Sequence, residues 1–162
     1  MSDASGLIAL QRDMAELRRR WSAVEAALTR PAQIPAVDLT AQGAAIGTTT
    51  LYAVPASWGG LYRVNWYAKV TQSATVSSTL GGLTIAFTDK TDSVAQSILC
   101  GGFRTDGAYA NSSAGNVTTT TLNGTAVIWA KASTNITYAF AYASSGATPM
   151  QYELHIKLQF LG

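Results

Sequence analysis

Apolar residues recur at alternating intervals of three and four positions through the first 30 residues of the chain. A repeat of about 3.5 residues keeps one seam facing a partner helix, whereas a helix packed on its own domain shows a wider stripe with a period of about 3.6. We therefore expect residues 1–30 to form a short coiled-coil helix, with a lone helix docked on its own domain as the alternative. The seam residues are Leu7, Leu10, Met14, Leu17, Trp21, Val24 and Leu28.

Charged residues beside the seam predict the direction of the partner helices. With the first leucine at an a position, Asp13 of one helix lies opposite Arg18 of the next in a parallel arrangement, and Arg20 lies opposite Glu25. Trp21 also occupies an a position, where dimers favour β-branched residues, so we expect a trimer. Three heptads are marginal alone. The rest of the chain is therefore expected to contribute to assembly.

The composition changes sharply at Pro31. Five of the 11 Lys/Arg residues and four of the 9 Asp/Glu residues precede it, and short alternating runs rich in Thr, Gly and aromatic residues follow. Pro31 and Pro35 fix φ and restrict the residues before them. This predicts an extended linker over residues 31–43 and a separate domain over residues 44–162.

The second domain has the period of two that is typical of strands with one buried face. In the last stretch, Tyr152, Leu154 and Ile156 point one way, while Glu153 and His155 point the other. The expected strands span residues 45–54, 61–71, 82–88, 93–103, 115–122, 125–131, 134–143 and 150–161.

A hairpin turn is predicted at Asn123-Gly124, because both residues accept a positive φ. Eight antiparallel strands fit a two-sheet jelly-roll sandwich, so the expected fold is mainly β. An immunoglobulin-like sandwich, with seven or nine strands, fits less well. An even strand count would bring both ends of the domain together. Four loops would then lie at the opposite end: 55–60, 89–92, 123–124 and 144–149.

Few residues are available for catalysis or metal binding. Cys100 is the single cysteine and His155 the single histidine, which excludes an intrachain disulfide and a multi-ligand Cys/His metal site within one chain. His155 is interpreted as a solvated strand residue, Cys100 as a buried thiol, and Asp89 and Asp92 as turn residues. We expect no catalytic site, no metal and no cofactor.

The order of a short heptad helix, a Pro-containing linker and a compact β domain resembles small trimeric bacteriophage virion proteins: fibres, spikes and capsid decorations. The segments "LYRVNWYAKVTQSAT", "LGGLTIAFTD" and "ITYAFAYASSG", with a last strand ending at "FLG", are similar to jelly rolls of the tumour necrosis factor and complement globular-head type. The resemblance implies a homotrimer on a virion surface. It carries no catalytic residues across.

The expected function is that of a short phage fibre or spike whose β head contacts the host surface. A capsid decoration protein on a threefold site is one alternative, and a cellular ligand-binding or adhesion module is another. The expected partners are the chain itself, other virion proteins and a host glycan or protein. Trp58, in a predicted loop, is a weak candidate for receptor contact, with packing against a neighbouring subunit as its other interpretation.

Other locations and partners are not favoured. A formal net charge of +2 is too small to attract nucleic acid. The sequence shows neither an apolar run that could cross a membrane nor a secretion signal. We expect a virion protein made in the host cytoplasm.

Overall fold

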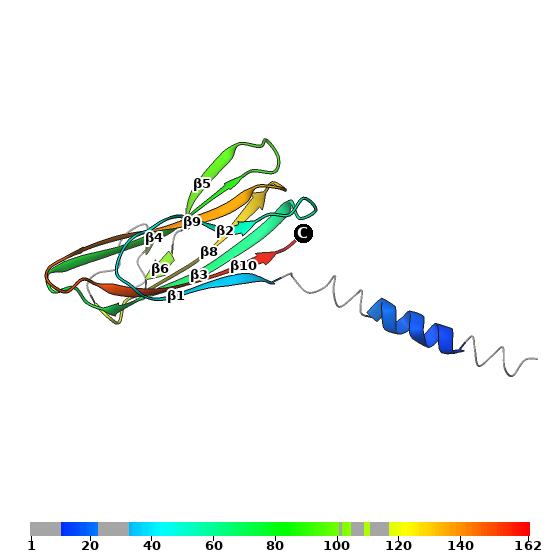
Figure 1. The fold of residues 1–162 in the computed structure, drawn as a ribbon, viewed down its shortest axis with the longest axis horizontal. Coiled ribbons are helices and arrows are strands. Elements are labelled where there is room, and N and C mark those ends of the chain that lie inside the picture. Colours follow the sequence, from blue (N-terminus) through cyan, green and yellow to red (C-terminus); the bar gives the residue numbers. More distant parts are fainter. Residues whose placement is uncertain (1–10, 23–32, 101, 105–108, 111–116) are drawn as a thin grey trace, which may run out of the picture. The chain divides into compact units, whose positions relative to one another are not determined.

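The structure, a computed structural model, describes residues 11–22, 33–100, 102–104, 109–110 and 117–162. The chain divides into two units, Met1–Ala32 and Gln33–Gly162. In the first unit, residues 11–22 form a helix (Figure 1). Within the described residues, no helix is long and apolar enough to cross a membrane.

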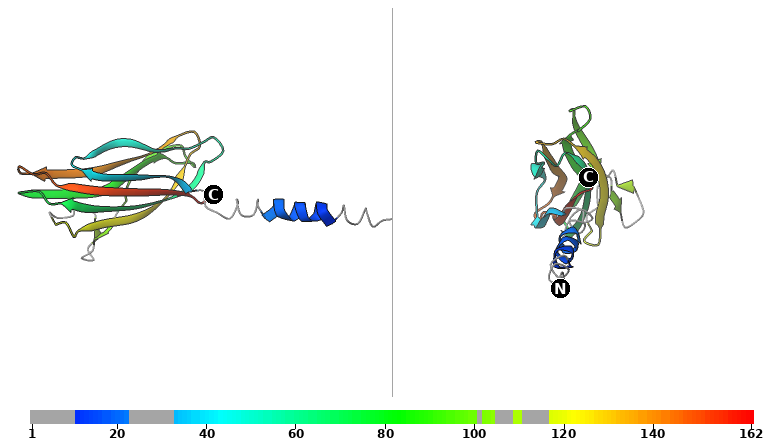
Figure 2. Two further views of the ribbon diagram at one scale, coloured as in Figure 1. Left: turned by 60° about the horizontal axis from the view of Figure 1, so that its bottom comes forward. Right: turned by 90° about the vertical axis from the view of Figure 1, so that its right-hand side faces the viewer.

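The second unit is a β domain whose strands pair antiparallel in two sheets. One sheet has the order β1-β10-β3-β8-β6-β7, and the other has the order β2-β9-β4-β5. The two layers are visible from the side in Figure 2. The strands are β1 Gln33–Gln42, β2 Ile46–Ala53, β3 Gly60–Gln72, β4 Ser77–Thr88, β5 Ala95–Cys100, β6 Gly102–Arg104, β7 Tyr109–Ala110, β8 Thr121–Ala130, β9 Asn135–Ser145 and β10 Gln151–Phe160.

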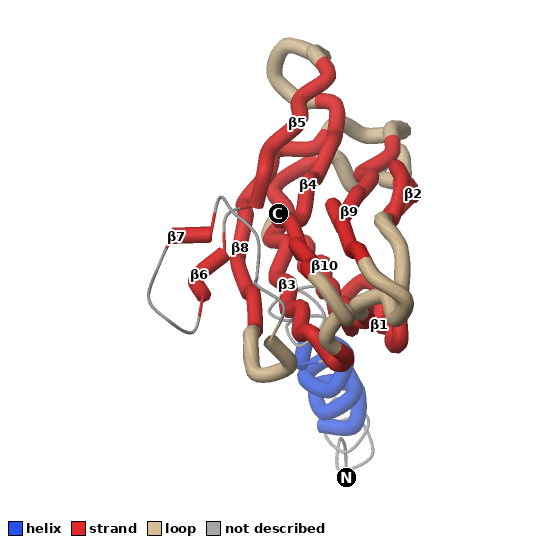
Figure 3. Tube along the Cα trace, turned by 90° about the vertical axis from the view of Figure 1, so that its left-hand side faces the viewer, coloured by secondary structure: helices blue, strands red, loops and turns tan. Residues whose placement is uncertain are grey.

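Eight of these strands build the sandwich, while β6 and β7 are short additions beside β8 (Figure 3). Each layer then has four principal strands, β1-β10-β3-β8 and β2-β9-β4-β5. This is a jelly-roll-like sandwich of antiparallel strands. The predicted fold class is confirmed.

The core lies between the two sheets and follows the expected alternation. In β3, Val64 and Trp66 are 0% and 4% exposed, whereas Arg63 and Asn65 face solvent. The Trp66 ring meets Phe140 of the other sheet edge-on, with centroids 5.9 Å apart. No polar or charged residue in the described part of the domain is classed as buried. Burial of apolar surface is therefore the main force that joins the layers.

The linker predicted at residues 31–43 is wrong, because β1 occupies most of it. Among the described strands, β1 is an edge strand that pairs with β10 alone. Ile34 is buried, and Val37 and Leu39 pack against the core. Pro35 lies at a register shift between Ile34 and Val37. A residue without an N–H group is tolerated at an edge or a bulge, so the prolines do not exclude a strand here.

The hairpin predicted at Asn123-Gly124 is also wrong. Both residues lie inside β8, where Asn123 pairs with Tyr67 and Gly124 pairs with Trp66 of β3. β6 pairs with the other edge of β8 at the same two residues. Ladder hydrogen bonds on both sides outweigh the turn preference of the dipeptide. One strand therefore replaces the two that were predicted.

The number of principal strands stays at eight, because one strand is gained at β1 and one is lost at Asn123-Gly124. The strands between these two positions, however, run opposite to the predicted direction relative to the ends of the domain. β1 begins where β10 ends, with Gln33 opposite Gln159, and we call this the entry end of the domain. The predicted tip 55–60 lies at the entry end, because Leu61 N donates to the carbonyl of Gly162 just after β10. The tip 89–92 lies there too, since Lys90 Nζ donates to the Gly59 carbonyl at 2.8 Å. Only the tip at 144–149 lies at the opposite end, as expected. It is accompanied there by loops 43–45 and 73–76.

Candidate functional site

The described part of the N-terminal helix exposes a stripe of large apolar side chains. Met14, Leu17 and Trp21 are 50%, 63% and 65% exposed. They line a shallow hollow of about 420 Å³ together with Arg18 and Ser22. Within the described helix, residues 11–22, these three side chains therefore face outward, as the seam of a coiled coil does in a single chain.

Other predicted seam positions lie outside the described residues. These are Leu7, Leu10, Val24 and Leu28, together with the charged Glu25. Arg20, expected to face Glu25 of a neighbour, forms an ion pair with Glu16 of its own helix at 2.6 Å. An acid four residues before a base is the favourable order along a helix. The pair of Asp13 and Arg18 stays a prediction.

The Trp58 side chain packs against other residues of its own chain. Its ring is partly buried and stacks on Phe160, with centroids 5.2 Å apart. Its carbonyl accepts a hydrogen bond from the Tyr62 hydroxyl at 2.6 Å. In the same loop, the Gly59 carbonyl accepts a hydrogen bond from the Lys90 ammonium. This arrangement favours a structural role for Trp58 over a sugar-stacking one.

A second surface is the solvent-facing side of the six-stranded sheet, which we call the outer face. His155 of β10 lies directly across from Tyr67 of β3, and their ring centroids are 6.0 Å apart. From β1, Asp38 Oδ1 lies 2.8 Å from His155 Nδ1. Three strands thus contribute to one cluster of side chains. His155 is a strand residue on the polar side, as predicted, but it is paired rather than merely solvated.

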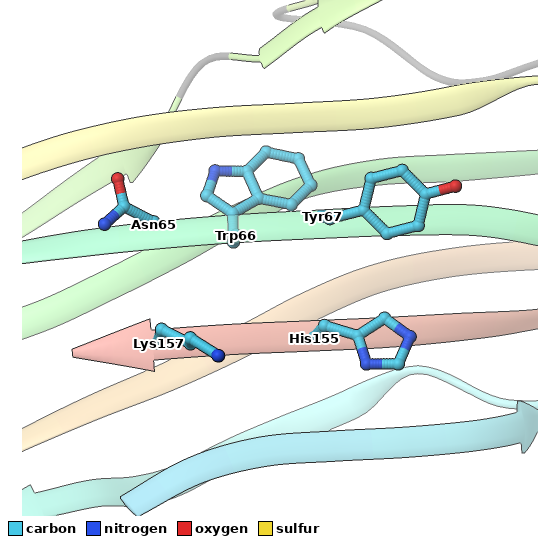
Figure 4. A pocket seen from close by; sticks show the side chains of 5 residues that line it. All are labelled: Asn65, Trp66, Tyr67, His155 and Lys157. Carbon is cyan, nitrogen blue, oxygen red and sulfur yellow. The ribbon is translucent and has the colours of Figure 1, made fainter. Parts of the chain in front are cut away.

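The same face is hollowed next to this cluster. Tyr67 and His155 line a hollow of about 290 Å³ with Asn65, Trp66 and Lys157 (Figure 4). Asn65 Oδ1 accepts a hydrogen bond from the Thr125 hydroxyl of β8 at 2.8 Å. The alternation in the last strand placed His155 on a polar face, but its proximity to Tyr67 and Asn65 follows from the pairing of β10 with β3.

The strongly perturbed titratable groups lie in the core rather than on these surfaces. Burial raises the pKa of the Cys100 thiol to about 11 and that of the Tyr62 and Tyr152 hydroxyls to about 12. Cys100 is 2% exposed, which confirms the predicted buried thiol. A protonated, buried thiol is a weak nucleophile. Within the described residues, no group of three or more His, Cys, Asp or Glu could hold a metal ion.

The sequence matches no protein-family model and no curated protein. One solved structure with some similarity contains the N-terminal CBM22-1 and GH10 modules of endo-1,4-beta-D-xylanase 10B from Clostridium thermocellum, complexed with xylohexaose. The likeness has a TM-score of 0.39 and 13% identity, and covers 71% of this chain but only 19% of the xylanase chain.

A second solved structure is that of Bacillus endospore appendages, described as disulfide-linked pili. It has a TM-score of 0.32 and 16% identity, and the match covers 82% of this chain and 90% of that one. Both TM-scores lie below about 0.5, so neither likeness carries an argument about function. The chain is placed in no family by these comparisons.

Proposed function

We propose that the chain is a non-enzymatic, homotrimeric structural protein of a virion, a short fibre or spike whose β domains contact a host surface. The observation that carries the proposal is the exposed stripe of Met14, Leu17 and Trp21 on the helix. These residues are half or more exposed in the single chain, and their spacing of three and four suits a partner helix better than solvent.

Multivalency explains what such an assembly gains. Three β domains held on one stem convert each later contact into an effectively intramolecular one, which can raise avidity by roughly a hundredfold or more. Weak contacts at each domain would then be sufficient for attachment. The short helix serves mainly to align the domains, because about three heptads are marginal as the only source of association.

Analytical ultracentrifugation of the full chain at micromolar concentration tests the assembly. We expect the mass of three chains, and a monomer at that concentration would overturn the proposal. The virion assignment is tested by mass spectrometry of purified phage particles from the source host. Absence of the chain from such particles would remove it.

The kind of virion protein is decided by a further comparison. Binding of the purified trimer to host cells supports a fibre or spike. Retention on emptied capsids, together with loss of capsid stability when the protein is removed, supports capsid decoration instead.

A further inference from the structure

An aromatic ledge lies on the outer face where β3 and β10 pair. The rings of Tyr67 and His155 are tilted by 33° to each other, and both side chains are partly exposed. Together they present carbon surface of the kind on which the C–H face of a flat ligand can pack. The ledge is carried by two central strands, so its backbone is held by ladder hydrogen bonds on both sides.

Neighbouring strands orient the polar groups around the ledge. Asp38 engages His155 at Nδ1, which leaves Nε2 as the ring nitrogen available to a ligand. Thr125 donates to Asn65 Oδ1, which leaves the Asn65 amide nitrogen as a donor. Supporting partners of this kind hold a site in its binding geometry before the ligand arrives.

Lys157 adds a positive charge at the same place. It is exposed, and it lies directly opposite Asn65 in the register of β10 and β3. Among the ion pairs of the described residues, none involves Lys157. An ammonium and an amide N–H carried by paired residues of neighbouring strands suit a carboxylate, because hydrogen bonds between charged partners are stronger than neutral ones.

We propose that this hollow binds a sugar ring that carries a carboxylate, such as a uronic acid. The C–H face of the ring packs on Tyr67 and His155, while the carboxylate accepts from Lys157 Nζ and Asn65 Nδ2. His155 Nε2 and the Tyr67 hydroxyl are left for the sugar hydroxyls. A hollow of about 290 Å³ has room for one sugar ring but not for several linked rings. The inference rests on the proposed function, since it names the ligand class that the β domain would contact.

The test is an NMR titration of the full chain with methyl glucuronide and, separately, with the neutral methyl glucoside. We expect shifts on Tyr67 and His155 and about tenfold weaker binding of the glucoside, which lacks the charged partner of Lys157. Lys157→Gln should weaken binding of the glucuronide alone, so that the two sugars bind with similar affinity. Tyr67→Leu should weaken binding of both sugars.

Lys69→Gln is the matched control, because Lys69 lies on the same face of β3 but opposite Glu153, outside the hollow. It should leave both affinities unchanged. Equal affinity for the two sugars, no shift at millimolar concentration, or indifference to Lys157→Gln would each overturn the inference.

Sedimentation of the same samples separates this inference from the proposed function. A trimer that does not bind the glucuronide overturns the sugar site alone. A monomer that binds it overturns the trimer alone. A third outcome is that the parent chain binds neither sugar and Tyr67→Leu converts the trimer to a monomer. The outer face would then be a subunit contact, and the sugar site would be overturned.

Discussion

Trp58 stacks on Phe160 with ring planes 27° apart and centroids 5.2 Å apart. Tyr62 completes the arrangement, since its ring lies 5.0 Å from that of Phe160 and its hydroxyl donates to the Trp58 carbonyl. These contacts join the loop between β2 and β3 to the last strand. They explain how a large aromatic side chain in a loop can belong to the packed part of the domain.

A double-mutant cycle should detect this stacking directly. Trp58→Ala and Phe160→Ala should each lower the free energy of unfolding by about 1 to 3 kcal/mol, because both rings are partly buried. In the double variant the loss should fall short of the sum by about 1 kcal/mol, the usual coupling of an aromatic pair. Urea unfolding measures all three values.

The control for the cycle is Trp129→Ala, since Trp129 is 40% exposed and contacts Lys90 instead. Its effect should add to that of Phe160→Ala. Additive effects of Trp58→Ala and Phe160→Ala would show that the stacked rings do not stabilise each other.

Much of the β domain could be predicted, because one buried face imposes a period of two on each strand. The predicted strands 61–71 and 150–161 correspond closely to β3 and β10. β1 was missed because Pro35 argues against a strand unless its edge position is known. The dipeptide Asn123-Gly124 was wrongly predicted to be a turn for a similar reason. Its pairing with β3 and β6 depends on the sheet order, which the local sequence does not reveal.

Substitution at Asn123 distinguishes a strand from a turn. Its side chain is exposed in β8, so Asn123→Thr should leave stability unchanged or raise it by up to about 1 kcal/mol, in line with strand preference. A hairpin turn would require positive φ, and a β-branched residue there would cost more than about 1 kcal/mol. Urea unfolding measures the difference, and a loss of that size would contradict the continuous strand.

The outer-face cluster could not be predicted from the sequence, because periodicity places His155 on a polar strand face but Asp38 fell in the predicted linker. Asp38 and His155 are 117 positions apart and meet only because β1 pairs with β10. Asn65 and Thr125 likewise meet through the pairing of β3 with β8. Periodicity assigns a face to a residue, whereas neighbours on that face follow from strand order.

Buried tyrosines predict a loss of stability at alkaline pH. Burial, with a smaller contribution from neighbouring tyrosines, raises the pKa of Tyr62 and Tyr152 from 10.0 to about 12. The folded state therefore holds these protons more tightly than the unfolded state does. Their contribution to stability is complete below pH of about 10 and is lost as the pH rises through about 12. Denaturant unfolding across this range should show the decline.

Tyr152→Phe provides the matched variant for the alkaline experiment. At neutral pH it should lower the unfolding free energy by about 1 kcal/mol, because the hydroxyl donates to the Ala44 carbonyl at 2.8 Å. Above pH of about 10 the variant should lose less stability than the parent chain, since one titrating group has been removed. An identical alkaline slope in both proteins would contradict the assigned cause.

The helix seam is tested by a pair of acidic substitutions in the described helix. Leu17→Asp places a carboxylate in the stripe, whereas Ala15→Asp adds the same charge at a position outside it. Burying unpaired carboxylates between helices costs about 3 kcal/mol or more, which weakens association roughly a hundredfold. We expect Leu17→Asp to sediment as a monomer at low micromolar concentration and Ala15→Asp to stay assembled. Both should keep the β signal in circular dichroism, because the helix and the β domain are separate units. Unchanged mass of the Leu17→Asp variant would show that the β domains associate without the seam.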